Sequence, residues 1–265
     1  VSFEGVTRVG VDETARRRGH NYLTAFVDLD VQRAMFCCEG RDASAVAAFT
    51  ADLEAHGGKA SAVETVTCDL SPAFASGVAE HLPKAKRVAD RFHVMQIANR
   101  QLDLVRAGEA RESEEKRRLL KRTKYVWLKR EENLTARQLE TKRSLAAENL
   151  KTGRACAMVE ALRRAYDTCE TAEEAKAELD ALTSWIMHSN VPQMKKLART
   201  LRDNEAEVLA YFKERATNAI LEGMNSVIQA AKRAARGFRN TEYFKTVIYL
   251  KLGKLPLVDA VCATH

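Results

Sequence analysis

The sequence predicts an α/β fold: a mixed five-stranded sheet with helices, interrupted by a large all-helical segment. Three observations support this prediction. Residues 8–39 alternate apolar and polar side chains and are rich in β-branched residues, as antiparallel strands are. Residues 43–89 alternate helix-like and strand-like segments, which add parallel strands to a sheet. From residue 92 to about residue 211, Leu, Ala, Lys, Glu and Arg dominate and the strand pattern stops.

The first three strands form a predicted antiparallel meander. In the first strand, Val9 and Val11 share one face, and Gly10 and Asp12 share the other. The second and third strands are expected over residues 22–29 and 34–38, joined by short turns at 16–20 and 30–32.

Two helices then alternate with two strands, over residues 43–56, 63–68, 71–82 and 86–89. Asp42 is a typical N-cap for the first helix, and Gly57 is a typical residue just past its end. The resulting order β-β-β-α-β-α-β is the plan of a ribonuclease H-like core.

The helical segment lies between the fifth strand and a final long helix, as an insertion into the core does. Breaks are expected near Gly108, Asn133, Gly153 and Pro192. We therefore expect a first core part over residues 1–93, a helical insertion over 94–212 and final core helices over 213–265.

The last long helix is predicted over residues 217–236, with Gly237 at the C′ position. One arc of about 100° carries its polar side chains, among them Glu222, Asn225, Gln229, Lys232, Arg233 and Arg236. Apolar residues occupy the opposite face, so one side packs and the other presents an acid, amides and cations.

The net charge of +7 is unevenly distributed. Residues 111–154 hold 14 Lys and Arg against 7 Asp and Glu, and residues 229–254 hold 7 against 1. Such basic segments suit a nucleic-acid partner, although solvated helix faces are an equally ordinary source of charge runs.

Several protein classes are excluded by composition. No apolar run is long enough for a membrane span, so we expect no membrane partner. The six cysteines show no zinc-ligand spacing and are expected to be reduced thiols. Because the sequence begins at Val1 in a strand-like run, we expect it to be a piece of a longer protein.

Three acids are the leading catalytic candidates. Asp12 lies in the first strand, Asp69 follows the fourth strand and Glu222 lies early in the final helix. In a ribonuclease H-like sheet these positions converge. Clustered carboxylates bind hard divalent cations, so the pattern predicts two Mg²⁺ or Mn²⁺ ions for phosphoryl transfer.

Other residues are secondary candidates, each with an ordinary structural alternative. Asp90, His93 and Asn225 form a predicted secondary site, although an Asp that caps a helix beside a hydrogen-bonded His explains the first two equally well. The predicted DNA contacts are Arg16, Arg17, Arg18, Trp127, Lys232, Arg233 and Arg236. Arg16–Arg18 could be a solvated turn, and Trp127 could pack between helices instead of stacking on a base.

Spaced motifs across residues 10–250 carry a resemblance to a known family. They are Gly10-Val-Asp-Glu13, Arg18-Gly-His20, Gly40-Arg-Asp42, Cys68-Asp-Leu-Ser71, Asp90-Arg-Phe-His-Val94, Tyr125-Val-Trp-Leu128, Asn218-Ala-Ile-Leu-Glu-Gly-Met-Asn-Ser226 and Arg236-Gly-Phe-Arg-Asn240. Together they resemble the catalytic domain of bacterial insertion-sequence transposases of the ISL3 family.

The resemblance implies a DDE transposase that cleaves DNA at insertion-sequence ends and transfers strands to target DNA. Asp12 would bridge both ions, with Asp69 and Glu222 each holding one. It also implies at least a homodimer during reaction, an N-terminal DNA-recognition region in the full-length protein, and a bacterial cytoplasmic, nucleoid-associated location. Two alternatives stay open: a catalytically decayed transposase-derived DNA-binding protein, and another ribonuclease H-like nuclease.

Overall fold

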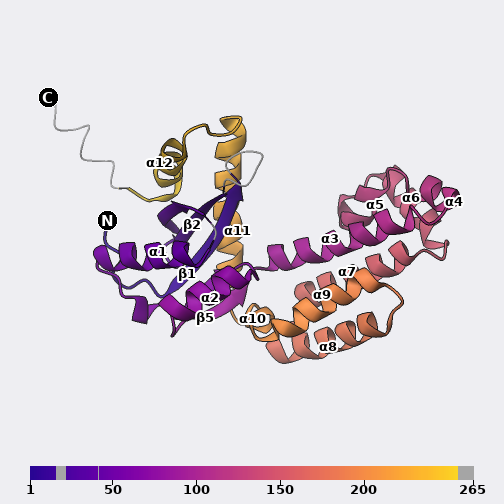
Figure 1. Ribbon diagram of the computed structural model, residues 1–265, viewed down its shortest axis with the longest axis horizontal. Coiled ribbons are helices and arrows are strands. Elements are labelled where there is room, and N and C mark those ends of the chain that lie inside the picture. Colours follow the sequence, from indigo (N-terminus) through magenta and orange to yellow (C-terminus); the bar gives the residue numbers. More distant parts are fainter. Residues whose placement is uncertain (16–21, 41, 256–265) are drawn as a thin grey trace. The chain divides into compact units, whose positions relative to one another are not determined.

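The computed structural model describes residues 1–15, 22–40 and 42–255 of the chain. These divide into two compact units. The core unit comprises the described residues of 1–90 and 214–255, and the helical unit comprises residues 91–213 (Figure 1). Within the described residues, no helix is both long and apolar enough to cross a membrane.

The core unit contains a mixed five-stranded sheet, as predicted. Its strands lie in the order β3-β2-β1-β4-β5. They are β1 (Arg8–Ala15), β2 (Tyr22–Asp28), β3 (Arg33–Glu39), β4 (Thr65–Cys68) and β5 (Lys86–Ala89). The first three pair antiparallel, while β4 and β5 extend β1 in parallel. The meander and the two parallel additions therefore form where the sequence pattern predicts them.

Helices cover both faces of this sheet. On one face α1 (Ala43–Ala55) and α2 (Pro72–His81) share an apolar cluster with Val9, Val11 and Val66. Within it the rings of Phe26 and Phe49 stack with centroids 4.4 Å apart. On the other face lie α11 (Arg215–Ala234) and α12 (Thr241–Leu252), which contribute residues such as Leu221 and Phe244 to a second cluster (Figure 1).

Gly10 allows α11 to approach β1 closely. A Cβ atom at this position would lie 2.8 Å from Val27 and 2.9 Å from Leu221, closer than side chains pack. Further along, the Gln229 amide donates a 3.0 Å hydrogen bond to Thr14. Because Leu221 contacts Gly10 and Gln229 contacts Thr14, α11 runs in the same direction as β1, with Asn225 about level with Asp12.

The end of α11 differs from the prediction in one detail. The Gly237 N–H donates to the Lys232 carbonyl, as in a Schellman motif. This hydrogen bond puts Arg236, with φ of 51°, at the left-handed C′ position, and Gly237 one residue later.

The helical unit contains eight α-helices in its residues 91–213. They are α3 (Arg91–Glu109), α4 (Glu114–Leu120), α5 (Lys124–Leu128), α6 (Ala136–Ala146), α7 (Lys151–Thr168), α8 (Ala172–His188), α9 (Pro192–Asp203) and α10 (Glu205–Ala210). The long helix α3 packs against α7 and α9, and α8 packs against the same two helices.

A buried carboxylate fixes the start of α7. Glu109 is 1% exposed and accepts hydrogen bonds from the backbone N–H groups of Lys151 and Thr152, each at 2.8 Å. These N–H groups lack partners within the helix, so a distant carboxylate replaces a local cap. The expected break near Gly153 therefore falls before Lys151, and Gly153 lies in the first turn of α7.

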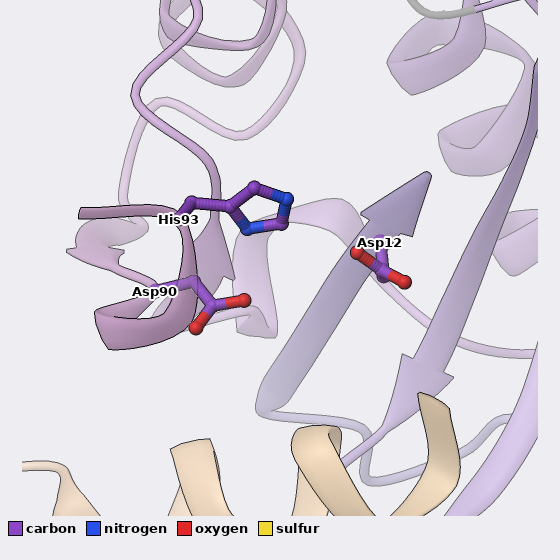
Figure 2. A group of neighbouring side chains, drawn as sticks. All are labelled: Asp12, Asp90 and His93. Carbon is purple, nitrogen blue, oxygen red and sulfur yellow. The ribbon is translucent and has the colours of Figure 1, made fainter. Parts of the chain in front are cut away.

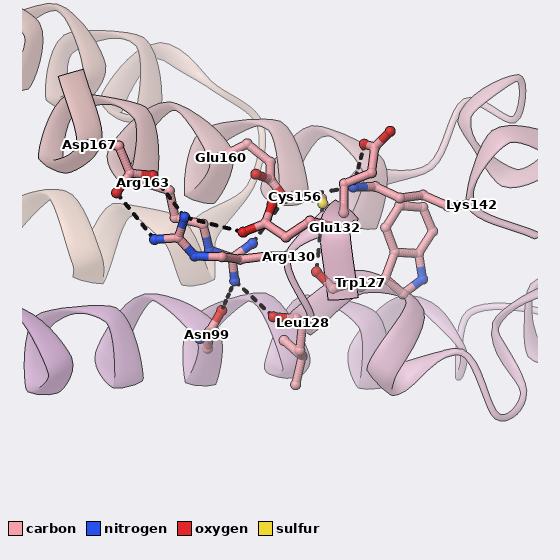
Figure 3. A network of polar contacts seen from close by, with 11 residues as sticks. Asn99, Trp127, Leu128, Arg130, Glu132, Lys142, Cys156, Glu160, Arg163 and Asp167 are labelled. Atoms are coloured by element: carbon pink, nitrogen blue, oxygen red, sulfur yellow. Dashed lines mark hydrogen bonds and ion pairs between the residues drawn. The ribbon is translucent and has the colours of Figure 1, made fainter. Parts of the chain in front are cut away.

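A polar network joins α7 to the segment after α5 (Figure 3). The Arg163 guanidinium donates to the Leu128 carbonyl at 2.8 Å and to Asn99 at 2.9 Å. Nearby, the Asp167 carboxylate accepts hydrogen bonds from both Arg130 and Arg91. Asp167 thus pairs with two cations of this unit that are distant from it in sequence.

Candidate metal centre

Three potential metal ligands come together in the structure (Figure 2). One ligand atom from each of Asp12, Asp90 and His93 lies within 4.8 Å of the others. Among the described residues, these are the three His, Cys, Asp or Glu side chains that lie close enough together to hold one metal ion.

Strand alternation explains why two carboxylates meet here. Gly10 faces α11, so Asp12, two residues later, lies on the same face of β1. Asp90 directly follows β5, and its N–H donates to the Cys68 carbonyl at the end of β4. The carboxyl ends of these parallel strands lie at one edge of the sheet, which brings Asp12 and Asp90 together.

His93 is placed by the local chain. It lies in the first turn of α3, three residues after Asp90, so the step from strand to helix positions both side chains. Asp90 is only 2% exposed, whereas Asp12 and His93 are half-buried.

The chemistry of this donor set suits a divalent cation. Carboxylate oxygens are typical ligands of Mg²⁺ and Mn²⁺, and neutral imidazole is a common ligand of transition metals. Two carboxylates and one imidazole therefore fit Mn²⁺ or a similar ion, and the carboxylates alone also fit Mg²⁺.

Asp69 is outside this group of three. It directly follows β4, whose last pair with β1 joins Thr67 and Gly10. Its carboxylate accepts a 2.9 Å hydrogen bond from the Ser71 N–H, at the turn that begins α2.

Glu222 is also outside the group, and its side chain is exposed. On a helical projection it lies on the same flank of α11 as Asn225 and Gln229. Gln229 reaches β1 from this flank, and Asn225 is half-buried about level with Asp12.

The predicted DNA-contact residues have different environments. Arg233 and Arg236 are exposed at the end of α11, and Lys232 is half-buried. Arg16, Arg17 and Arg18 lie outside the described residues. Trp127 is 2% exposed, and its indole N–H donates to the Thr123 hydroxyl at 3.2 Å. It lines a cavity of about 500 Å³ within the helical unit, together with Lys142 and Arg154.

The sequence did contain a signal for His93 as a potential ligand beside Asp90. An Asp at the end of a strand, followed three residues later by a His, places both side chains near the first turn of a helix. This signal is weak, because the same pattern occurs in ordinary helix capping. The pairing of β1, β4 and β5 brings Asp12 to the same edge, so that three potential ligands lie together there.

Sequence comparison relates the chain to known proteins. Residues 9–248 match the sequence profile of a family described as transposase, the ISL3 type of DDE transposases. The chain is 27% identical to the transposase for insertion sequence element IS1557 of Mycobacterium tuberculosis over 94% of its own length and 61% of the relative. It is also 27% identical to the transposase for IS1001 of Bordetella parapertussis, over 89% of its length and 58% of that relative. The chain thus spans about three fifths of the length of these curated relatives, and with its family match over residues 9–248 it belongs to the ISL3 family of transposases.

Proposed function

We propose that this chain is the catalytic domain of a transposase that uses divalent metal ions to cleave DNA and transfer strands at insertion-sequence ends. The observation that carries the proposal is the convergence of Asp12, Asp90 and His93 within 4.8 Å at one edge of the sheet. The sheet order β3-β2-β1-β4-β5, with α11 across one face, supports a ribonuclease H-like core into which the helical unit is inserted.

Asp12 has the central role in this proposal, because it belongs both to the group of three potential ligands and to the set of acids predicted from the sequence. Asp90 and His93 lie beside it in space, and we expect Asp69, which follows the neighbouring strand β4, to lie near it as well. We assign Asp12, Asp69 and Glu222 as the ligands of two ions and Asp90 and His93 as additional ligands around Asp12. The polar flank of α11 that bears Glu222 and Asn225 supports this assignment, since Gln229 on that flank contacts β1.

Two bound Mg²⁺ or Mn²⁺ ions would supply positive charge at the attacking and leaving oxygens of a phosphodiester. The chain itself positions the DNA. Lys232, Arg233 and Arg236 at the end of α11 would neutralise phosphates, so that the scissile bond reaches the carboxylate edge. The longer relatives support an additional DNA-recognition region, and we expect the active complex to be a homodimer or larger, working on DNA in the bacterial cytoplasm.

Metal binding by the chain tests this proposal directly. Titration calorimetry with Mn²⁺ should show binding that Asp12→Asn abolishes and that Asp90→Asn weakens. Glu13→Gln is the matched control, because strand alternation places Glu13 on the opposite face of β1. Unchanged Mn²⁺ binding in folded Asp12→Asn protein would contradict the proposed site.

Cleavage assays on a longer protein that includes a recognition region separate the alternatives. Metal-dependent cleavage and joining of DNA strands is the expected result. DNA binding without any cleavage would indicate a decayed, binding-only protein, and cleavage of only the RNA strand of a hybrid would indicate a different nuclease.

A further inference from the structure

Helix α9 of the helical unit has an apolar side and a basic side. The apolar side is buried and consists of Met194, Leu197, Ala198 and Leu201. At 100° per residue, the opposite side carries four cations within an arc of about 120°, namely Lys195, Lys196, Arg199 and Arg202. Lys195 is half-buried and the other three are exposed. The helix is therefore held by its apolar side, with its positive charge facing outward.

The cations of α9 are not neutralised by the protein. Within the described part of the chain, Lys195, Lys196 and Arg199 form no ion pair, and Arg202 donates to the Thr183 hydroxyl at 3.1 Å. Helix α8 packs against α9 and contains four acids, but none of them forms an ion pair with these cations. The single acid of α9, Asp203, is its last residue.

The basic segment that the sequence indicates in this unit, residues 111–154, is different. Half of its cations pair with acids, namely Lys116, Arg117, Arg118, Lys124, Arg130, Lys142 and Lys151. A nearby carboxylate repels a phosphate, so a paired cation attracts the phosphate less than an unpaired one does. Solvated basic helix faces are common, but a face whose cations stay unpaired beside an acidic helix is suited to an external anion.

We propose that the basic face of α9 binds the phosphate backbone of duplex DNA, independently of base sequence. From Lys195 to Arg202 the helix rises about 10 Å. A duplex carries one phosphate charge per about 1.7 Å of its axis, so several phosphates lie within this length. The inference rests on the proposed function for DNA as the anionic partner, and adds a DNA contact in the helical unit to the one proposed for α11.

Neutralisation of this face tests the contact. The variant combines Lys195→Gln, Lys196→Gln and Arg199→Gln, and keeps Arg202 because it contacts Thr183. Fluorescence anisotropy with a random-sequence duplex at several salt concentrations gives Kd and its salt dependence. The slope of log Kd against log salt concentration should fall by about two to three, and binding at 0.1 M salt should weaken by at least about tenfold.

Three lysines of the core unit provide the matched control. Lys59, Lys84 and Lys86 are exposed, form no ion pair within the described residues, and precede or begin β4 and β5. They therefore lie toward the amino ends of these parallel strands, whereas Asp90 follows the carboxyl end of β5. The combined Gln substitutions remove the same total charge as the α9 variant. We expect them to leave the salt slope nearly unchanged.

The outcomes separate this inference from the proposed function. Equal slopes for the wild type and a folded α9 variant would overturn the α9 contact, even if the wild type binds Mn²⁺ and cleaves DNA. An equal loss of slope in the control would also overturn it, because net charge alone would then be responsible. A loss of slope confined to the α9 variant, in a chain that binds no Mn²⁺, would support the α9 contact and refute the proposed metal centre.

A second copy of the chain is the other polyvalent partner that the acidic helix α8 suggests for this face. Sedimentation of the wild type and the α9 variant distinguishes it from DNA. The same oligomeric state in both proteins, with the expected loss of salt slope, supports the DNA contact. A change in oligomeric state with an unchanged slope would assign α9 to an interface between copies and overturn the inference.

Discussion

At the scale of single residues, the function depends on which carboxylates hold the metal ions. Asp12 is grouped with Asp90 and His93, while Asp69 and Glu222 are assigned from the end of β4 and the polar flank of α11. Substitutions that keep shape but remove charge distinguish ligands from neighbours.

Glu222→Gln is the sharpest such substitution. It should lower metal-dependent strand cleavage by several orders of magnitude, because an amide cannot neutralise a bound cation, while folding and DNA binding persist. Since Glu222 is exposed, its replacement should leave the free energy of unfolding nearly unchanged. Gel-based cleavage assays in Mg²⁺ check the prediction, with Glu13→Gln as the active control. If only Glu13→Gln were inactive, the wrong acid would have been assigned.

The buried thiol of Cys37 should make the free energy of unfolding of the core unit depend on pH in the alkaline range. Burial raises the pKa of Cys37 to about 12, and Cys37 is 3% exposed. In the unfolded chain the Cys37 thiol loses its proton from about pH 9, whereas in the folded chain it stays protonated until about pH 12. The free energy of unfolding is therefore not reduced by this group below pH 9, and it falls as the pH rises toward 12. The free energy of unfolding should fall by roughly 1 kcal/mol per pH unit above pH 9 from this group.

Urea denaturation at several pH values measures this slope. Cys37→Ala should flatten it, whatever the variant's stability at neutral pH. Burial also raises the pKa of Cys38, to about 11, so a smaller slope should remain. An identical slope in Cys37→Ala would show that the thiol is not the group responsible.

At the scale of elements, Glu109 links the end of α3 to the start of α7. Its burial opposes ionisation, but hydrogen bonds from Thr152 and Lys151 still lower the pKa of the carboxyl. Glu109→Gln should reduce the free energy of unfolding by about 2–4 kcal/mol, because buried N–H groups lose a charged acceptor. Because the pKa of Glu109 is lowered in the folded state, its carboxylate stabilises the fold at pH values above the ordinary Glu pKa. This stabilisation decreases as the pH falls through that pKa. Acid sensitivity between about pH 5 and pH 3 should therefore decrease in the variant.

Glu112→Gln is the matched control. Glu112 binds Lys116 and Lys151, both also near Glu109, but its side chain is 39% exposed. Its replacement should cost no more than about 1 kcal/mol, as exposed ion pairs contribute little. Equal destabilisation by both variants, measured by urea denaturation, would contradict the assigned role of Glu109.

A separate prediction concerns DNA binding by the cationic end of α11. Charge reversal of Lys232, Arg233 and Arg236 should weaken DNA binding and make log Kd less dependent on log salt concentration, with the slope falling by nearly one for each phosphate that is no longer neutralised. Reversal of Lys176 is a suitable control, because it lies outside both basic segments and pairs with Asp180 and Glu205. Binding isotherms at several salt concentrations give the slopes. Equal slopes for wild type and the α11 variant would mean that this end of α11 does not touch DNA.

At the scale of the whole molecule, the chain has two compact units, each with buried apolar residues. Calorimetry should resolve two unfolding transitions, each sensitive to cavities in its own unit. Leu162→Ala, in α7, and Phe49→Ala, in α1, each empty a fully buried site and should cost about 2–5 kcal/mol. Each variant should lower one transition and leave the other in place. A single transition shifted equally by both variants would show that the units unfold together.

The elements and their order follow from local sequence patterns. Periodicity of two or of 3.6 is a local property, so β1 to β5, α1, α2 and the long helix α11 could be predicted within a few residues. The strand order of the meander and the parallel additions also followed, because short turns and single-helix crossovers restrict topology. The same reasoning makes Asp12 a candidate metal ligand, and the structure groups it with two other potential ligands.

Which side chains meet depends on the folded chain. The parallel register of β1, β4 and β5 brings Asp90 and His93 to Asp12, which no spacing between residues 12 and 90 encodes. Packing buries Trp127 within the helical unit, and Asp167 pairs with Arg91 and Arg130 across long sequence separations. Propensity and periodicity act over a few residues, whereas burial and charge pairing depend on contacts between distant segments, so these features became visible only in the tertiary structure.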